Sequence, residues 1–298
     1  MDPAIRIRDL HMSYGGRAVL DGLTLEVERG EVFALLGPNG AGKTTTINAL
    51  STLVRPDRGA VEIAGFDVTR APDEVRLRIS LSGQSVAVDD MLTATENLVM
   101  LGRLSGLRPR DARARAAALL ERFDLARVGA QRVRAFSGGM RRRLDLAMSF
   151  VVTPEVVFLD EPTTGLDTRS RRELWEAIRG LAAGGTTVFL TTQYLEEADQ
   201  LADRIAVLDG GRVVALGTPE ELKARVGGES VQVRDEQGAV LREIPTDGSV
   251  GGLRRALDAL DEAGADGVVT LHRPTLDDVF LALTDHPATA PIPAKDVA

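Results

Sequence analysis

The segment GPNGAGKT, at residues 37–44, is the strongest indication of fold in this chain. It fits the pattern G-x-x-x-x-G-K-[ST], in which glycines let backbone amides turn inward around phosphate oxygens. The apolar run VFALLG (32–37) reads as a strand buried on both faces, and TTTINALSTL (44–53) reads as a helix. Strand, loop and helix in this order predict a phosphate site at a helix N-terminus, and they disfavour a glycine-rich turn without a ligand.

This loop supplies most of the candidate nucleotide-binding residues. The ammonium group of Lys43 is expected to reach the β- and γ-phosphates and to act in catalysis, and the hydroxyl of Thr44 is expected to ligate Mg²⁺. The predicted binding residues are Gly37, Pro38, Asn39, Gly40, Ala41, Gly42, Lys43, Thr44 and Thr45.

A second motif, VVFLDE at 156–161, is an apolar strand that ends in two adjacent acids. Because side chains alternate along an extended chain, Asp160 and Glu161 point in different directions and can take different roles. Asp160 can hold hydrated Mg²⁺, and Glu161 can act as the general base that activates the attacking water. The alternative is a buried strand whose acids merely lead out to solvent. The phosphate loop earlier in the chain favours the catalytic interpretation.

The third motif is FSGGM at 136–140, just before an arginine-rich helix start. Ser-Gly-Gly alone would be only a helix N-cap. The motif resembles the ABC signature, usually written L-S-G-G-Q, and Ser137 lies 23 residues before Asp160 (160 − 137), as in ABC ATPases. The resemblance implies that Ser137, Gly138 and Gly139 bind the γ-phosphate of an ATP held by the opposite protomer. Since the chain holds one copy of each motif, it also implies a head-to-tail homodimer that encloses two ATP molecules.

The resemblance extends to three further positions. Gln84 matches the Q-loop glutamine, which contacts Mg²⁺ in the family, and Asp167 in the segment 165–167 matches the D-loop at the dimer interface. The D-loop segment also reads as a turn with a helix N-cap, and both interpretations can hold together. Tyr14 precedes Lys43 by 29 residues (43 − 14), where the family places a ring that stacks on adenine. The alternative is an ordinary tyrosine at a strand end.

One position departs from the family pattern. After the strand TTVFLTT (186–192) the family usually has a switch histidine, but this chain has Gln193. A glutamine amide can donate a hydrogen bond to a γ-phosphate oxygen, but it cannot titrate as a histidine does. If Glu161 is the general base, hydrolysis should survive, with Gln193 as a catalytic contact. The alternative is a nucleotide-gated regulatory module that binds ATP and turns it over little.

Three longer stretches resemble the daunorubicin-resistance-type exporter ATPases. They are RRRLDLA (141–147), TTQYLEEAD (191–199) and RPTLDDVF (273–280). The core resemblance covers about residues 4–225, and it extends through a C-terminal appendage to about 284. The arginine run 141–143 is interpreted as a solvated helix face rather than as a special site.

The subfamily resemblance implies a motor that drives a separate integral membrane permease from the cytoplasmic face of the membrane. The chain would then be peripheral, held through its partner, and its cargo would be a drug, a polyketide or a lipid. A docking surface is expected in the helical region 85–110, although its apolar residues also suit an ordinary subdomain core. These apolar residues are Met91, Leu92, Leu98, Met100 and Leu101.

The composition and the motif set disfavour several other classes of protein. A net charge of -8 and an aromatic content of 4% disfavour a nucleic-acid partner, which requires clustered cations or stacking platforms. The absence of cysteine excludes disulfides and thiolate metal sites. The N-terminus lacks the apolar core of a signal peptide, and no apolar run approaches the ~20 residues that span a bilayer. A P-loop kinase or GTPase would leave residues 137–140 unexplained, and the ABC proteins of translation or DNA repair normally carry a second cassette or insertions that are absent here.

Strands that alternate with helices predict an α/β fold with a largely parallel sheet. We expect a P-loop NTPase cassette of the ABC type over residues 1–227, with an antiparallel N-terminal β region and a helical subdomain at about 85–150. A shift in composition near Gly227 predicts a small α+β domain over 228–285. The Pro/Ala-rich tail 286–298 has no apolar face to bury, so we expect it to be disordered.

Overall fold

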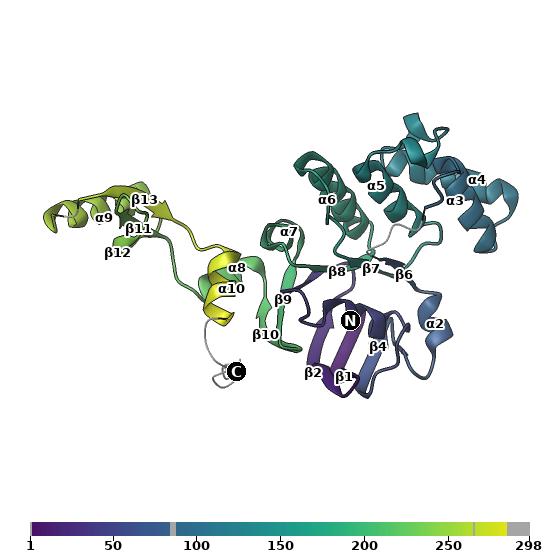
Figure 1. The fold of residues 1–298 in the computed structure, drawn as a ribbon, viewed down its shortest axis with the longest axis horizontal. Helices are drawn as coiled ribbons and strands as arrows, with labels where there is room; N and C mark the ends of the chain where they lie inside the picture. The colour runs from purple at the N-terminus through teal and green to yellow at the C-terminus, as the bar shows by residue number, and fades with distance from the viewer. Residues whose placement is uncertain (1, 84–87, 265, 285–298) are drawn as a thin grey trace. The chain divides into compact units, whose positions relative to one another are not determined.

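The structure is a computed structural model that describes residues 2–83, 88–264 and 266–284 (Figure 1). The chain divides into two compact units, Met1–Leu216 and Gly217–Ala298. Helix α8 (Pro219–Ala224) belongs to the second unit, whereas the boundary suggested by composition follows it, at residue 227. The domain limits drawn from the sequence therefore stay predictions. The tail 286–298 lies outside the described residues.

A six-stranded sheet of order β10-β9-β3-β8-β7-β6 forms the centre of the first unit. Its middle strands β3 (Val32–Leu36), β8 (Thr187–Thr192) and β7 (Val156–Asp160) are parallel and buried along their whole length. A strand covered on both faces needs a continuous apolar run, which is what these segments have. The flanking strands are β6 (Ile79–Ser82), β9 (Arg204–Asp209) and β10 (Arg212–Gly217).

An antiparallel sheet of order β2-β1-β4-β5 packs against this centre. Its strands are β1 (Ile5–Tyr14), β2 (Arg17–Val27), β4 (Arg58–Ile63) and β5 (Phe66–Asp67). Along β1, Ile5 and Ile7 are buried while Arg8 is exposed, so one face of the sheet is apolar. These residues share a core with Phe33, Phe158 and Phe189 of the parallel sheet. The predicted α/β class, with a mostly parallel core sheet and an antiparallel N-terminal region, is confirmed.

Helices cover the other side of the parallel sheet, opposite β1, β2 and β4 (Figure 1). They include α5 (Gly138–Met148), α6 (Thr168–Ala183), α3 (Ala94–Leu104) and α4 (Pro109–Arg122). The sequence from about Thr93 to Phe123 reads as one helical region, but the structure divides it into α3 and α4, because Gly106 has a φ of 87° and Pro109 starts a new helix. The sequence Thr93-Ala94-Thr95-Glu96 predicts a capping box, and the structure confirms it: the Thr93 hydroxyl accepts from the Glu96 amide at 3.1 Å, and the Glu96 carboxylate accepts from the Thr93 amide at 2.8 Å.

Shorter elements complete the first unit. Helix α1 (Lys43–Leu50) follows the phosphate loop, α2 (Pro72–Arg76) precedes β6, and α7 (Leu195–Leu201) follows β8. Two 3₁₀ turns, η1 (Ala126–Val128) and η2 (Val133–Ala135), connect α4 to α5. No helix within the described part of the chain is both long enough and apolar enough to cross a bilayer.

The second unit is a small α+β assembly. Its sheet has the order β12-β11-β13, formed by Val240–Pro245, Ser230–Arg234 and Val268–His272. Helix α9 (Val250–Glu262) contributes Ala256 and Leu260 to a core that Val231 and Val233 complete. The sequence Thr218-Pro219-Glu220-Glu221 predicts a helix start, and helix α8 begins there with a capping box of Thr218 and Glu221. Helix α10 (Leu276–Thr284) ends the described chain.

Candidate active site

Three neighbouring parallel strands deliver the candidate residues to one edge of the sheet. Strand β8 lies between β3 and β7, with Leu36 paired to Thr192 and Asp160 paired to Thr191. The phosphate loop, Gln193 and Glu161 therefore all leave the sheet at the carboxyl ends of adjacent strands. This edge is where open α/β sheets bind their ligands.

The phosphate loop wraps around the side chain of Lys43. This side chain is only 4% exposed, and its ammonium group donates to the carbonyl oxygens of Gly37 at 2.8 Å and Pro38 at 3.1 Å. Gly42 has a φ of 110°, and a Cβ there would come within 2.6 Å of Leu20 Cδ2, so only glycine fits. Loop geometry thus fixes the cation at the start of α1.

Asp160 is a buried carboxylate at the end of β7. Its oxygens accept hydrogen bonds from Thr44 Oγ1 at 3.0 Å and from Thr191 Oγ1 at 2.6 Å. Thr44 and Asp160 stand 116 positions apart in the sequence, and the fold brings together these two of the three residues predicted to contact Mg²⁺. No group of three or more metal-binding side chains occurs among the described residues. A hydroxyl and one carboxylate suit Mg²⁺, which keeps waters and substrate phosphates as its other ligands.

Glu161 has contacts that differ from those of its neighbour Asp160. Its φ is 48°, an uncommon left-handed conformation for a residue other than glycine. The amide donates to the carbonyl and the hydroxyl of Thr191, at 3.1 Å each. The carboxylate lies 3.3 Å from the Lys43 ammonium and accepts from the Thr164 hydroxyl at 3.3 Å. The two adjacent acids therefore face different partners, Thr44 and Lys43.

The signature segment forms the N-terminus of α5. Ser137 is the N-cap, and its hydroxyl accepts from the Met140 amide at 3.3 Å. Ser137 and Gly138 are exposed, whereas Gly139 is buried. A Cβ on Gly139 would lie 2.4 Å from Ser170 Oγ, so a glycine is required where α5 approaches α6. This segment presents an exposed helix N-terminus, which attracts anions.

Asp167 caps α6 beside this segment. Its carboxylate accepts from the amide and the hydroxyl of Ser170, at 2.9 Å each, and the amide hydrogen bond lowers its pKa below the usual value. The helix N-cap predicted at this position is confirmed. Its place in a dimer interface stays a prediction.

The other predicted site residues occupy less enclosed positions. Tyr14 ends β1 and is 48% exposed, so its ring is accessible for stacking. Gln193 directly follows β8 and is half-buried. Gln84 lies outside the described residues. Their roles in adenine, γ-phosphate and Mg²⁺ binding stay predictions.

Arg142 is the residue that the sequence interpretation missed. The solvated helix face assigned to the run 141–143 is wrong for this side chain, which is 6% exposed. Successive helix positions are rotated by about 100°, so three consecutive arginines cannot all face solvent. Arg142 points inward and donates to main-chain carbonyls of Gly83, Asp160 and Pro162. Burial lowers its pKa, although it remains a cation.

A cavity of about 260 Å³ lies between the signature helix and Glu161. Its lining residues are Gly138, Arg141, Arg142, Glu161, Thr164, Gly165 and Leu166.

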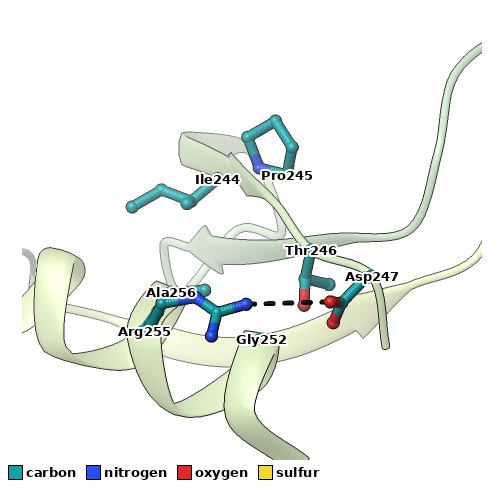
Figure 2. A pocket seen from close by; sticks show the side chains of 7 residues that line it. All are labelled: Ile244, Pro245, Thr246, Asp247, Gly252, Arg255 and Ala256. Carbon is teal, nitrogen blue, oxygen red and sulfur yellow. Dashed lines mark ion pairs between the residues drawn. The ribbon is translucent and has the colours of Figure 1, made fainter. Parts of the chain in front are cut away.

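Another cavity, of about 310 Å³, lies in the second unit between the end of β12 and α9 (Figure 2). Asp247 and Arg255 form an ion pair at its wall, 3.7 Å apart. Both side chains are more than half exposed, so water screens their charges. This cavity lacks the buried ionic contacts of the first unit.

The phosphate loop, the acidic strand end and the signature helix on this sheet define an ATP-binding cassette. Residues 20–164 match the family model described as "ABC transporter". The chain is 54% identical to the daunorubicin resistance ATP-binding protein DrrA3 of Streptomyces coeruleorubidus, over 95% of this chain and 96% of the relative. It is 39% identical to the Nod factor export ATP-binding protein I of Ralstonia nicotianae, over 95% of this chain and 94% of that protein.

Solved structures of similar fold point to the same family as these relatives. One described as the "Structure of ATP binding subunit of ABC transporter" is 27% identical and has a TM-score of 0.68, over 94% of this chain and 99% of that chain. The chain belongs to the ABC transporter family, as its motifs predicted. It is the ATP-hydrolysing module of an ABC exporter.

Proposed function

We propose that two copies of this chain assemble head to tail around two molecules of Mg·ATP and power a separate membrane permease. One observation carries the proposal: the Lys43 ammonium and the Glu161 carboxylate meet at 3.3 Å above the phosphate loop. A cation for the phosphates and a base for water are thereby held at one point of a buried site. Both are needed for attack on a γ-phosphate.

Each residue takes one role in the proposed hydrolysis. Lys43 and the loop amides bind the phosphates, and Gln193 donates its amide hydrogen to a γ-phosphate oxygen. Glu161 accepts a proton from water while the new oxygen–phosphorus bond forms and the bond to the ADP oxygen breaks. Thr44 and Asp160 would hold Mg²⁺, which neutralises negative charge on the phosphates when bound. Tyr14 stacks on the adenine ring.

The exposed signature segment supports the dimer. Ser137 and Gly138 present a helix N-terminus to solvent, and the chain has a single phosphate loop to pair with it. In a head-to-tail homodimer each signature segment binds the γ-phosphate held by the partner. Asp167, close to this segment through Ser170, then lies at the interface. Gln84 keeps its proposed contact with Mg²⁺.

Apolar side chains in the helical region support the membrane partner. Met91 is 60% exposed and Met100 is 40% exposed, although Leu98 belongs to the core at 1%. We assign the exposed methionines to the permease contact, which would hold the chain at the cytoplasmic face of the membrane. The relatives named for daunorubicin resistance and Nod factor export support a drug, a polyketide or a lipid as the cargo.

The dimer is tested with the substitution Ser137→Arg, which puts bulk and positive charge where the partner's γ-phosphate docks. We expect the variant to bind nucleotide as a monomer but to lose ATP-driven dimerisation in gel filtration with Mg·ATP. Ser105→Arg is a matched control, because Ser105 is an exposed serine at the end of α3. A Ser137→Arg protein that dimerises and hydrolyses ATP normally would show that the head-to-tail assembly is wrong. A wild-type dimer without turnover would favour the regulatory module instead.

A further inference from the structure

Arg142 makes an unusual set of contacts for a buried cation. Its Nε donates to the Pro162 carbonyl at 2.8 Å, its Nη1 to the Gly83 carbonyl at 2.8 Å, and its Nη2 to the Asp160 carbonyl at 3.3 Å. Arg142 also forms an ion pair with the Asp145 carboxylate, but that contact is longer than the three hydrogen bonds, at 3.6 Å. A buried guanidinium is costly unless its donors are satisfied, and here main-chain oxygens satisfy them.

Two of these carbonyls flank Glu161. Asp160 and Pro162 are its immediate neighbours, so the guanidinium holds the chain on both sides of the proposed base. Glu161 itself has a φ of 48°, a backbone conformation that costs energy and persists only where the surroundings enforce it. On the strand side, Thr191 accepts from the Glu161 amide; on the helix side, Arg142 fixes the adjacent carbonyls.

We infer that Arg142 is a positioning residue for Glu161, clamping the carbonyls on either side so that the carboxylate faces Lys43. Arg142 also lies on the helix whose N-terminus is the signature segment, and it shares a cavity with Gly138 and Glu161. The clamp thus joins the signature helix of each chain to the base of the same chain. In a dimer, contact of that helix with the partner's nucleotide would therefore influence the position of the Glu161 carboxylate.

The planar fork of arginine is essential to this role. Its donors lie in one plane and reach three oxygens at once, which a lysine ammonium on a flexible stem does not reproduce. Arg142→Lys keeps the charge and loses the fork, so it separates geometry from charge. Arg142→Gln removes the charge and keeps an amide donor.

This inference rests on the proposed role of Glu161 as the base, and the test separates the two. We expect Arg142→Gln and Arg142→Lys in the full chain to lower kcat for ATP roughly 10- to 100-fold, the effect of a small displacement of a catalytic group. KM for ATP should change little, because the phosphate loop is untouched. Arg143→Gln is the matched control: it lies on the same helix, its side chain is 13% exposed, and it pairs with Glu173 at 3.2 Å, away from Glu161.

Two further measurements decide the outcome. In a Glu161→Gln background, Arg142→Gln should cause no further loss of turnover, because residues that act as a unit are not additive. Amide hydrogen exchange of the segment 156–166 should rise in Arg142→Gln and not in Arg143→Gln. Additive losses, or exchange that stays unchanged, would overturn the positioning role. Turnover that survives Glu161→Gln alone would instead overturn the proposed base.

Discussion

The two compact units differ in the polar groups that they bury. In Met1–Leu216, buried ionisable side chains are frequent, and four of them surround the carboxyl edge of the parallel sheet. Those four are Lys43, Arg142, Asp160 and Glu197. Among the described residues of Gly217–Ala298, the buried polar side chains are Ser230 and Gln232, which are both neutral.

This contrast in buried charge indicates where the chemistry of the chain is located. Burying a charge is expensive, so a cluster of buried charges indicates a functional site rather than a device for stability. Exposed apolar side chains do not distinguish the units, since Leu77 is 73% exposed in the first and Val250 is 78% exposed in the second. We therefore expect hydrolysis to depend on the first unit and to tolerate damage to the core of the second.

Removing the proposed base should have the largest effect, and it tests whether hydrolysis depends on the buried charges of the first unit. Glu161→Gln should lower ATP turnover by about 10²–10⁴-fold, the usual contribution of a general base, while ATP binding persists. Phosphate release and nucleotide binding measured on the same preparation check this. Glu155→Gln is the control, because Glu155 precedes the opposite end of β7, where it pairs with Arg29 at 2.8 Å. Unchanged turnover in Glu161→Gln would remove the base from this position.

Substitutions of Gln193, at the carboxyl edge of the parallel sheet, should have a smaller effect on turnover. The proposed hydrogen bond from its amide to a charged phosphate would contribute about 1.5–3 kcal/mol, so Gln193→Ala should slow turnover roughly 10- to 150-fold. Gln193→His should remain active and gain a pH dependence near neutrality, because imidazole titrates there and an amide does not. Steady-state phosphate release from pH 6 to 8.5 separates these outcomes. Activity in the histidine variant alone would identify the natural chain as a nucleotide sensor.

A substitution in the core of the second unit tests whether hydrolysis tolerates damage to that unit. Leu260 is 3% exposed, and Leu260→Ala should cost that unit about 2–5 kcal/mol of stability. ATP turnover should stay within about twofold, because the residues that share a core with Leu260 all belong to the second unit. Leu190→Ala, the same deletion in buried strand β8, is the control that should abolish turnover by disrupting the site. A collapse of turnover in Leu260→Ala would show that the second unit takes part in hydrolysis.

The buried carboxyl of Glu197 makes the stability of the first unit depend on pH, which gives a further test of its buried charges. Its carboxyl on α7 is fully buried and accepts from Trp175 Nε1 at 3.3 Å, and burial raises its pKa above the usual 4.5. A folded state with a raised carboxyl pKa is most stable below the unfolded pKa and loses that stability as the pH rises through the folded pKa. Glu197→Gln should therefore be more stable than the natural chain above the unfolded pKa, and this advantage should grow as the pH rises toward the folded pKa.

Thermal unfolding measures this gain, since each 1 kcal/mol shifts Tm by about 2–4 °C in a domain of this size. Arg171 and Arg142 are the cations that face Glu197, and the substitution removes its attraction to both. Glu196→Gln on the same helix is the control, because this side chain is 67% exposed and pairs with Arg171 at 3.6 Å. A pH-independent difference between the Glu197→Gln protein and the natural chain would mean that the carboxyl is ionised throughout.

Local features of the fold were readable from the sequence. The capping boxes at Thr93 and Thr218, the N-caps at Ser137 and Asp167, and the buried strand β7 each depend on a few consecutive residues. Side-chain type and backbone conformation are coupled directly over such short distances. The family motifs likewise indicated which residues form the candidate site.

Contacts between distant segments were decided only by the tertiary structure. The pairing of Thr44 with Asp160 joins residues 116 positions apart, and motif resemblance could suggest the pairing but not its geometry. Helix geometry indicates that the run 141–143 cannot face solvent as a whole, but the sequence does not show which arginine turns inward. That choice depends on how α5 is rotated against the end of β7, which packing across the whole unit determines.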